Sequence, residues 1–131
     1  MARARGSFEV TSWEEETYEE MDDGGKLTRA SVAQTFTGDI EGNGAVQWLM
    51  SYRADGTAHF VGLQRVRGTM AERSGAFVLE TIGEFDGKVA RWAASVVDGS
   101  GTGGLRGLTG SGTFEAPNGP RASFDLNYQL T

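Results

Sequence analysis

The groups in this chain most able to move a proton are one histidine, one carboxylate within an apolar run and one tyrosine. His59 is the only histidine, Glu80 lies in "FVLETIGEF", and Tyr52 ends a run in which large and polar side chains alternate. Imidazole, carboxyl and phenol groups in a pocket can act as general acids, general bases or hydrogen-bond donors. Glu80, His59 and Tyr52 are therefore the candidate catalytic residues.

The motifs of several other chemistries are missing from the sequence. There is no cysteine, and the patterns of α/β-hydrolases, zinc proteases and P-loops do not occur. The glycine-rich "SGTGG", residues 100–104, is not followed by a periodic helix, so we do not interpret it as a phosphate-binding loop. A single histidine cannot build a multi-histidine metal site. The acidic run "EEETYEEMDD", residues 14–23, lacks the spacing of a calcium loop, so we interpret it as a solvated strand end and turn. We expect no metal and no cofactor.

The elements that must position these groups are β-strands. Glycine accounts for 20 of the 131 residues and proline for two, and the glycines lie in turns between alternating runs. Asp-Gly and Asn-Gly turns between such runs indicate hairpins. The runs are residues 7–18, 27–40, the two that flank "ADGT", 76–85, the run from "FDGK" to residue 97, 108–115 and 121–130. They predict an all-β, eight-stranded antiparallel up-and-down closed barrel, with a two-sheet sandwich as the alternative.

The turn at Asp55-Gly56 decides which way His59 faces. A two-residue loop places His59 opposite Tyr52 on the inner face, but it brings Arg65 and Arg67 to that face too. A three-residue loop over residues 54–56, with the glycine in a left-handed bulge position, turns the histidine and both arginines outward. Because an unpaired buried arginine is costly, we favour the bulged turn.

Two further hairpins extend the same inner face. A two-residue loop at Glu72-Arg73 pairs Val66 with Leu79, and one at Asp86-Gly87 pairs Thr81 with Trp92. These registers direct Glu80 outward. In the first strand, Trp13 breaks the alternation, which indicates a bulge.

The resulting interior is aromatic and aliphatic, with a few neutral polar groups, as in many small-molecule pockets. The predicted ligand-binding residues are Gln34, Trp48, Met50, Tyr52, Phe60, Gln64, Phe77, Leu79, Thr81, Trp92 and Tyr128. An eight-stranded lumen can also be filled by its own side chains. The alternative is then a filled-core homodimer that uses Leu49, Val78 and Ile82 on its outer face.

The overall charge limits the partners. The formal net charge is −6, which argues against nucleic acid and anionic membrane surfaces. No apolar run could span a bilayer, and no signal peptide is recognisable, so we expect a cytoplasmic protein. The length fits a single domain over residues 1–131, and we expect residues 1–6 to be a flexible N-terminus.

Several stretches together resemble a known bacterial family. These are "GSFEVTSWEE", "LTRASVAQTFTGDIEG", "SYRADGTAHFVGL", "RSGAFVLETIGEFDG" and "VVDGSGTGGLRGLTGSGTFEA". They look like a domain-of-unknown-function family whose fold resembles the calycin-like barrel of allene oxide cyclase. The resemblance implies an eight-stranded antiparallel barrel, and it raises the prospect of an isomerase, cyclase or lyase that encloses a small apolar substrate. No catalytic residue of allene oxide cyclase can be matched to a position here. A small-molecule-binding barrel remains our first expectation.

Overall fold

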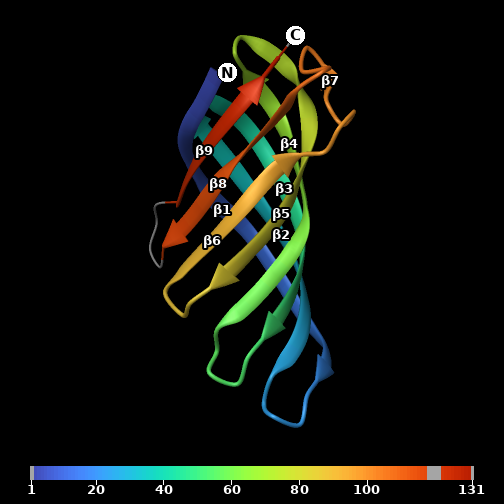
Figure 1. Ribbon diagram of the computed structural model, residues 1–131, viewed down its shortest axis with the longest axis vertical. Helices are drawn as coiled ribbons and strands as arrows, with labels where there is room; N and C mark the ends of the chain where they lie inside the picture. The colour runs from blue at the N-terminus through green and yellow to red at the C-terminus, as the bar shows by residue number, and fades with distance from the viewer. Residues whose placement is uncertain (1, 118–121, 131) are drawn as a thin grey trace.

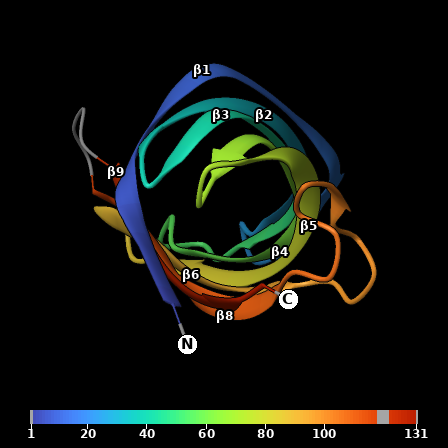
Figure 2. The ribbon, with the colours of Figure 1, turned by 90° about the horizontal axis from the view of Figure 1, so that it is seen from above.

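The strands of the protein close into one antiparallel barrel. The computed structural model describes residues 2–117 and 122–130. Its strands are β1 (Ala2–Glu20), β2 (Lys26–Gly38), β3 (Ile40–Tyr52), β4 (Ala58–Met70), β5 (Arg73–Phe85), β6 (Val89–Val96), β7 (Thr102–Gly103), β8 (Thr109–Pro117) and β9 (Ala122–Gln129). Each long strand pairs with its chain neighbours, and β1 pairs with β9 to close the ring (Figures 1 and 2). The two-residue β7 pairs only with β5, so eight strands form the barrel, as predicted.

The β3–β4 hairpin has the bulged turn that the charge argument favoured. The Arg53 N–H donates to the Thr57 carbonyl at 2.8 Å, and the Gly56 N–H donates to the Arg53 carbonyl at 3.0 Å. Gly56 has φ +88°, the left-handed conformation that the bulge requires. Ser51 consequently pairs with His59, and the histidine lies on the outer face.

The two following hairpins turn one residue away from their predicted positions. The β4–β5 loop is Ala71-Glu72, because Met70 remains in β4 with its side chain in the core, and Val66 then pairs with Phe77. The β5–β6 loop is Gly87-Lys88, since Gly87 takes a positive φ at the first loop position, and Thr81 then pairs with Ala94. Both pairings are shifted by two residues, so every side chain keeps its predicted face.

The N-terminal segment belongs to the barrel. Residues 2–6, which we expected to be flexible, lie in β1 and pair with β9. The Arg3 guanidinium donates to both carboxylate oxygens of Asp125, at 2.8 and 2.5 Å, which anchors this end. Further along β1, the register shifts between Val10 and Ser12, and this confirms the bulge expected near Trp13.

The barrel has two unlike ends. At the end that carries the chain termini, the connection over residues 97–108 folds back, and its Leu105 and Leu108 are buried in the core (Figure 1). The opposite end carries the turns at residues 21–25, 53–57 and 86–88, and the cavities described below lie toward it. In the part of the chain that the structure describes, no helix has the length and apolar character needed to cross a membrane.

Candidate ligand-binding cavity

An apolar cavity of about 210 Å³ lies inside the barrel on the side of the hairpin turns. Its walls come from seven strands, and all three tryptophans of the chain are among them. The lining residues are Phe8, Val10, Trp13, Gln34, Trp48, Met50, Tyr52, Phe60, Phe85, Ala90, Trp92 and Ala116. The lumen is thus filled with side chains toward the termini and hollow toward the turns.

Aromatic rings packed edge to face form the deep wall of this cavity. Trp48 and Trp92 lie with ring centroids 5.0 Å apart at 74°, and each also packs against Phe60. Trp92 stacks on Phe114 at 5.3 Å. Gly83 pairs with Trp92, and a Cβ there would come within 2.5 Å of the Phe60 ring, so the glycine makes room for the rings. Such packing gives the wall a fixed shape.

Two hydrogen bonds join buried polar side chains around the rings, and three buried polar atoms of the described chain have no partner. The Trp48 indole donates to the Thr81 hydroxyl at 3.1 Å, and the Gln64 amide donates to the Gln34 amide oxygen at 2.6 Å. Among the described residues, Gln34 Nε2, Gln64 Oε1 and Trp92 Nε1 are buried without a partner. Buried polar atoms are rarely left unpaired, so these three atoms are exceptions within the core.

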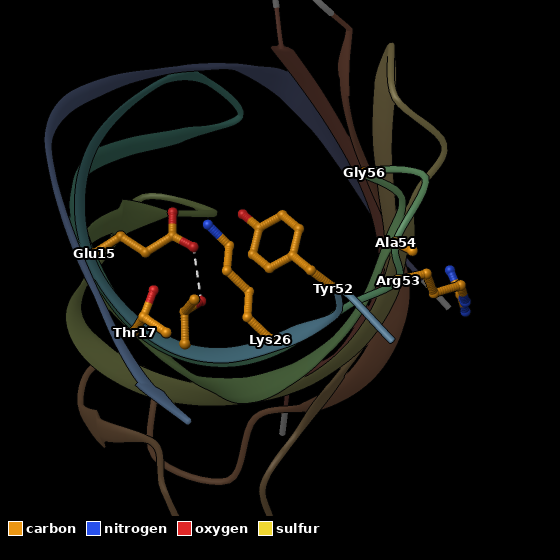
Figure 3. A pocket seen from close by; sticks show the side chains of 9 residues that line it. Glu15, Thr17, Lys26, Tyr52, Arg53, Ala54 and Gly56 are labelled. Carbon is orange, nitrogen blue, oxygen red and sulfur yellow. Dashed lines mark hydrogen bonds between the residues drawn. The ribbon is translucent and has the colours of Figure 1, made fainter. Parts of the chain in front are cut away.

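A second, polar hollow of about 500 Å³ forms the mouth of the barrel, and Tyr52 lines both spaces. The side chains of Glu15, Lys26 and Tyr52 point toward one another there, whereas Arg53 points away (Figure 3). The Lys26 ammonium lies 5.1 Å from the centre of the Tyr52 ring. Burial, together with the neighbouring Glu15 carboxylate, raises the pKa of Tyr52 to about 12, so its hydroxyl remains a proton donor at neutral pH.

Glu15 is the acidic residue of the site that sequence reasoning missed, along with several apolar lining residues such as Phe8 and Trp13. We interpreted the whole acidic run as solvated, and most of it is exposed, but Glu15 is half-buried in the mouth. Its carboxylate accepts hydrogen bonds from the Trp13 indole at 3.0 Å and from the buried Thr28 hydroxyl at 2.7 Å. The sequence signal for Glu15 was the alternation that restarts after the bulge. Trp13 lines the apolar cavity, and Glu15 and Thr17, two and four residues later, line the polar mouth.

The predicted ligand-binding residues divide into two groups. Those that line the cavity are Gln34, Trp48, Met50, Tyr52, Phe60 and Trp92. Those buried elsewhere in the core are Gln64, Phe77, Leu79, Thr81 and Tyr128. Of this second group, Gln64 and Thr81 contact cavity residues through the hydrogen bonds given above, so they position the lining rather than form it.

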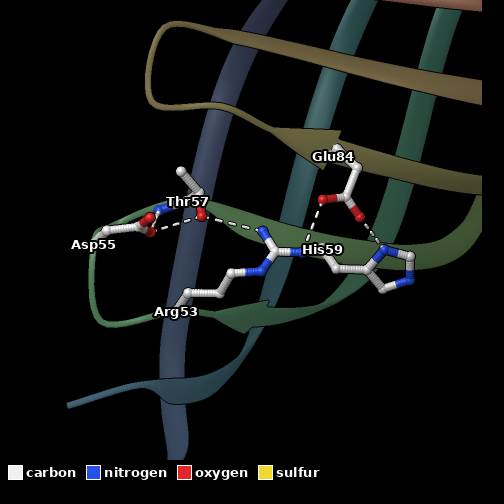
Figure 4. Close-up of polar contacts among 5 residues, drawn as sticks. All are labelled: Arg53, Asp55, Thr57, His59 and Glu84. Atoms are coloured by element: carbon white, nitrogen blue, oxygen red, sulfur yellow. Dashed lines mark hydrogen bonds and ion pairs between the residues drawn. The ribbon is translucent and has the colours of Figure 1, made fainter. Parts of the chain in front are cut away.

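The other two catalytic candidates lie on the outside of the barrel. Glu80 is exposed and pairs with Leu63, whose side chain is exposed as well. His59 is exposed, and its Nδ1 contacts Glu84, which also accepts from Arg53 at 2.9 Å (Figure 4). Hydrogen bonds from His59 and then Arg53 hold the pKa of Glu84 below its usual value. The structure brings only Tyr52 of the three candidates to the cavity.

Two other expectations concern the surface. Within residues 2–117 and 122–130, no group of three or more histidine, cysteine or acidic side chains is arranged to hold a metal ion. Leu49 and Ile82 are about half exposed on the outer face, where Val61 lies between them across the sheet. Dimerisation through this face stays a prediction.

The fold and the site define a class: a closed eight-stranded antiparallel barrel with one filled half and one hollow, aromatic-lined half. The chain belongs to the family described as "Protein of unknown function (DUF3224)", whose model matches residues 4–128. A solved structure with the same fold is that of a protein with unknown function from the DUF3224 family of Shewanella oneidensis MR-1. It is 28% identical, with a TM-score of 0.85 over 100% of this chain and 98% of that one. No curated protein matches the chain. The family resemblance is thereby confirmed, and the likeness to allene oxide cyclase stays a prediction.

Proposed function

We propose that the protein binds a small, largely apolar molecule in the hollow half of the barrel. The observation that carries this proposal is the cavity of about 210 Å³ with three tryptophans in its lining. A well-packed barrel of this size has enough large side chains to fill its lumen, yet here the filling stops halfway. A preformed apolar space with a few polar groups is the usual form of a small-molecule site.

The test uses 2-isopropenylnaphthalene, a hydrocarbon with two fused aromatic rings that suits an apolar, aromatic-lined cavity. We expect saturable one-to-one binding by titration calorimetry, together with a change in tryptophan emission, because every tryptophan lines the site. Ala90→Leu adds three carbons at the cavity wall and should weaken binding about tenfold or more, which corresponds to about 1.4 kcal/mol.

The matched control lies three residues further along the same strand. Ala93 is exposed on the outer face of β6, so Ala93→Leu adds the same atoms without entering the cavity. Equal weakening by both variants, or no saturable binding to the unmodified protein, would refute the proposal.

An isomerase or cyclase that works by enclosure is the second candidate function. The observation in its favour is Tyr52, a protonated phenol at the junction of the apolar cavity and the polar mouth. Such a hydroxyl can stabilise negative charge that develops on a substrate oxygen. Incubation with a bacterial small-molecule extract should convert one compound into an isomer of equal mass, and Tyr52→Phe should abolish this conversion. No mass-conserving conversion with the unmodified protein would count against catalysis.

A further inference from the structure

Two unpartnered donors distinguish this cavity from a purely apolar one. Trp92 is 3% exposed and Gln34 is 2% exposed, and both side chains line the cavity. In the described part of the chain, the indole Nε1 of Trp92 and the amide Nε2 of Gln34 have no hydrogen-bond partner. The third unpartnered atom, on Gln64, belongs to a residue outside the lining.

The other two indoles of the cavity show that an unpaired N–H is the exception here. Trp13 donates to Glu15 and Trp48 donates to Thr81, at 3.0 and 3.1 Å. An indole N–H can only donate, so Trp92 needs an acceptor, and no described side chain or carbonyl provides one. A buried donor without an acceptor is destabilising, and a ligand with a suitable oxygen can remove that cost.

The charge around the cavity limits the kind of acceptor. None of the described residues that line it is lysine or arginine, and the cations Lys26 and Arg53 line the polar mouth instead. A carboxylate or phosphate in the apolar space would therefore be buried without a counter-charge. A neutral carbonyl or ether oxygen accepts hydrogen bonds without that cost.

We propose that the natural ligand is a neutral apolar molecule with a carbonyl or ether oxygen at its buried end, which accepts from the Trp92 indole and the Gln34 amide. This inference rests on the proposed function, because it specifies the ligand of the same cavity. It assigns Trp92 and Gln34 to the recognition of that oxygen. The remaining lining residues enclose the hydrocarbon part.

The experiment compares two probes of the same shape, 2-acetylnaphthalene and 2-isopropenylnaphthalene, which differ by C=O against C=CH₂. The ketone should bind the unmodified protein about tenfold more tightly than the hydrocarbon, as one hydrogen bond of about 1.4 kcal/mol predicts. In ¹H–¹⁵N spectra, the Trp92 indole proton should shift downfield with the ketone and not with the hydrocarbon. The indole signals are assigned from three single tryptophan-to-phenylalanine variants.

The variants separate recognition from folding. Trp92→Phe keeps an aromatic ring but has no donor, so it should reduce the preference for the ketone, because only the Gln34 amide still donates. Gln34→Leu should reduce the preference for the ketone while hydrocarbon binding persists. Hydrocarbon binding reports an intact cavity, so a variant that binds neither probe is recognised as unfolded. In that case the shift of the Trp92 indole proton in the unmodified protein tests the proposal.

The outcomes are distinct. If both probes bind the unmodified protein equally and the Trp92 signal shifts alike with each, the acceptor inference is wrong and the proposed function stands. If neither probe binds, both are wrong. A preference for the ketone that is undiminished in Trp92→Phe and in Gln34→Leu would also overturn the assignment of these donors.

Discussion

Tyr52 connects the two spaces of the site, and its protonation state determines what it can do there. The phenol lies beside the Lys26 ammonium, and burial together with the Glu15 carboxylate raises the pKa of Tyr52 to about 12. At neutral pH the residue is consequently a donor and not a base. Any catalytic role assigned to it must be hydrogen bonding or proton donation.

The raised pKa of Tyr52 predicts that one tyrosine ionises at an unusually high pH. The chain has three tyrosines, and phenolate absorbance should show one of them ionising near pH 12. The step should disappear in Tyr52→Phe and persist in Tyr18→Phe, since Tyr18 is 56% exposed. A raised pKa in the folded state also means that the unfolded chain releases this proton first, near pH 10. The stability advantage of Tyr52 over phenylalanine should therefore be complete below pH 10 and lost as the pH rises toward 12.

At the scale of elements, the strands and their inward faces could be predicted because their signals are local. The alternation of apolar and polar residues and the Asp-Gly turns can each be recognised within a few residues. The cost of a buried arginine then favoured the bulged β3–β4 turn over the two-residue turn. The positions of two loops could not be predicted this way. Burial of Met70 fixes the first loop and depends on the assembled barrel, whereas the second was a choice between two local glycine turns, in which Gly87 takes the first loop position.

The β4–β5 loop is strained, and this predicts a stabilising change. Ala71 and Glu72 have φ +54° and +63°, which is the left-handed region that side chains with a Cβ disfavour by about 1–2 kcal/mol per residue. Asn-Gly is the preferred sequence for two such loop positions. The double variant Ala71→Asn, Glu72→Gly should raise the free energy of unfolding by about 1–2 kcal/mol.

Denaturant unfolding followed by tryptophan emission would measure this effect. The control is the opposite change at the bulged turn, Gly56→Ala, which introduces the same kind of strain at φ +88° and should destabilise the protein. Unchanged stability in the Asn-Gly variant would show that the two residues do not carry the strain that their backbone angles imply.

Glu15 and the hollow half of the lumen show what remained beyond local reasoning. The β1 bulge resets which residues face inward, so the acidic run alternates between the mouth and the solvent. The filled half depends on residues 97–108 folding back to bury Leu105 and Leu108, a contact between segments distant in the sequence. Composition alone could not distinguish a lumen filled throughout from one filled at a single end.

For the molecule as a whole, this asymmetry predicts that stability and binding are separable. Leu105 is 1% exposed in the filled half, so Leu105→Ala should cost about 2–5 kcal/mol of unfolding free energy. It lies outside the lining of the cavity, so the affinity for 2-isopropenylnaphthalene should stay within about twofold. Trp13→Ala should affect binding more than stability, because Trp13 lines the cavity but is 45% exposed. Its loss should weaken binding about tenfold and reduce stability less than Leu105→Ala does.

Calorimetric titration and denaturant unfolding of the same samples would test this separation. Binding should also raise the unfolding free energy of Leu105→Ala by as much as it raises that of the unmodified protein, since stabilisation by a ligand depends only on its concentration relative to Kd. A parallel loss of affinity and stability in Leu105→Ala would mean that the two halves act as one unit. The filled half would then shape the cavity as well as close the barrel, and the prediction that one end provides stability and the other provides binding would be wrong.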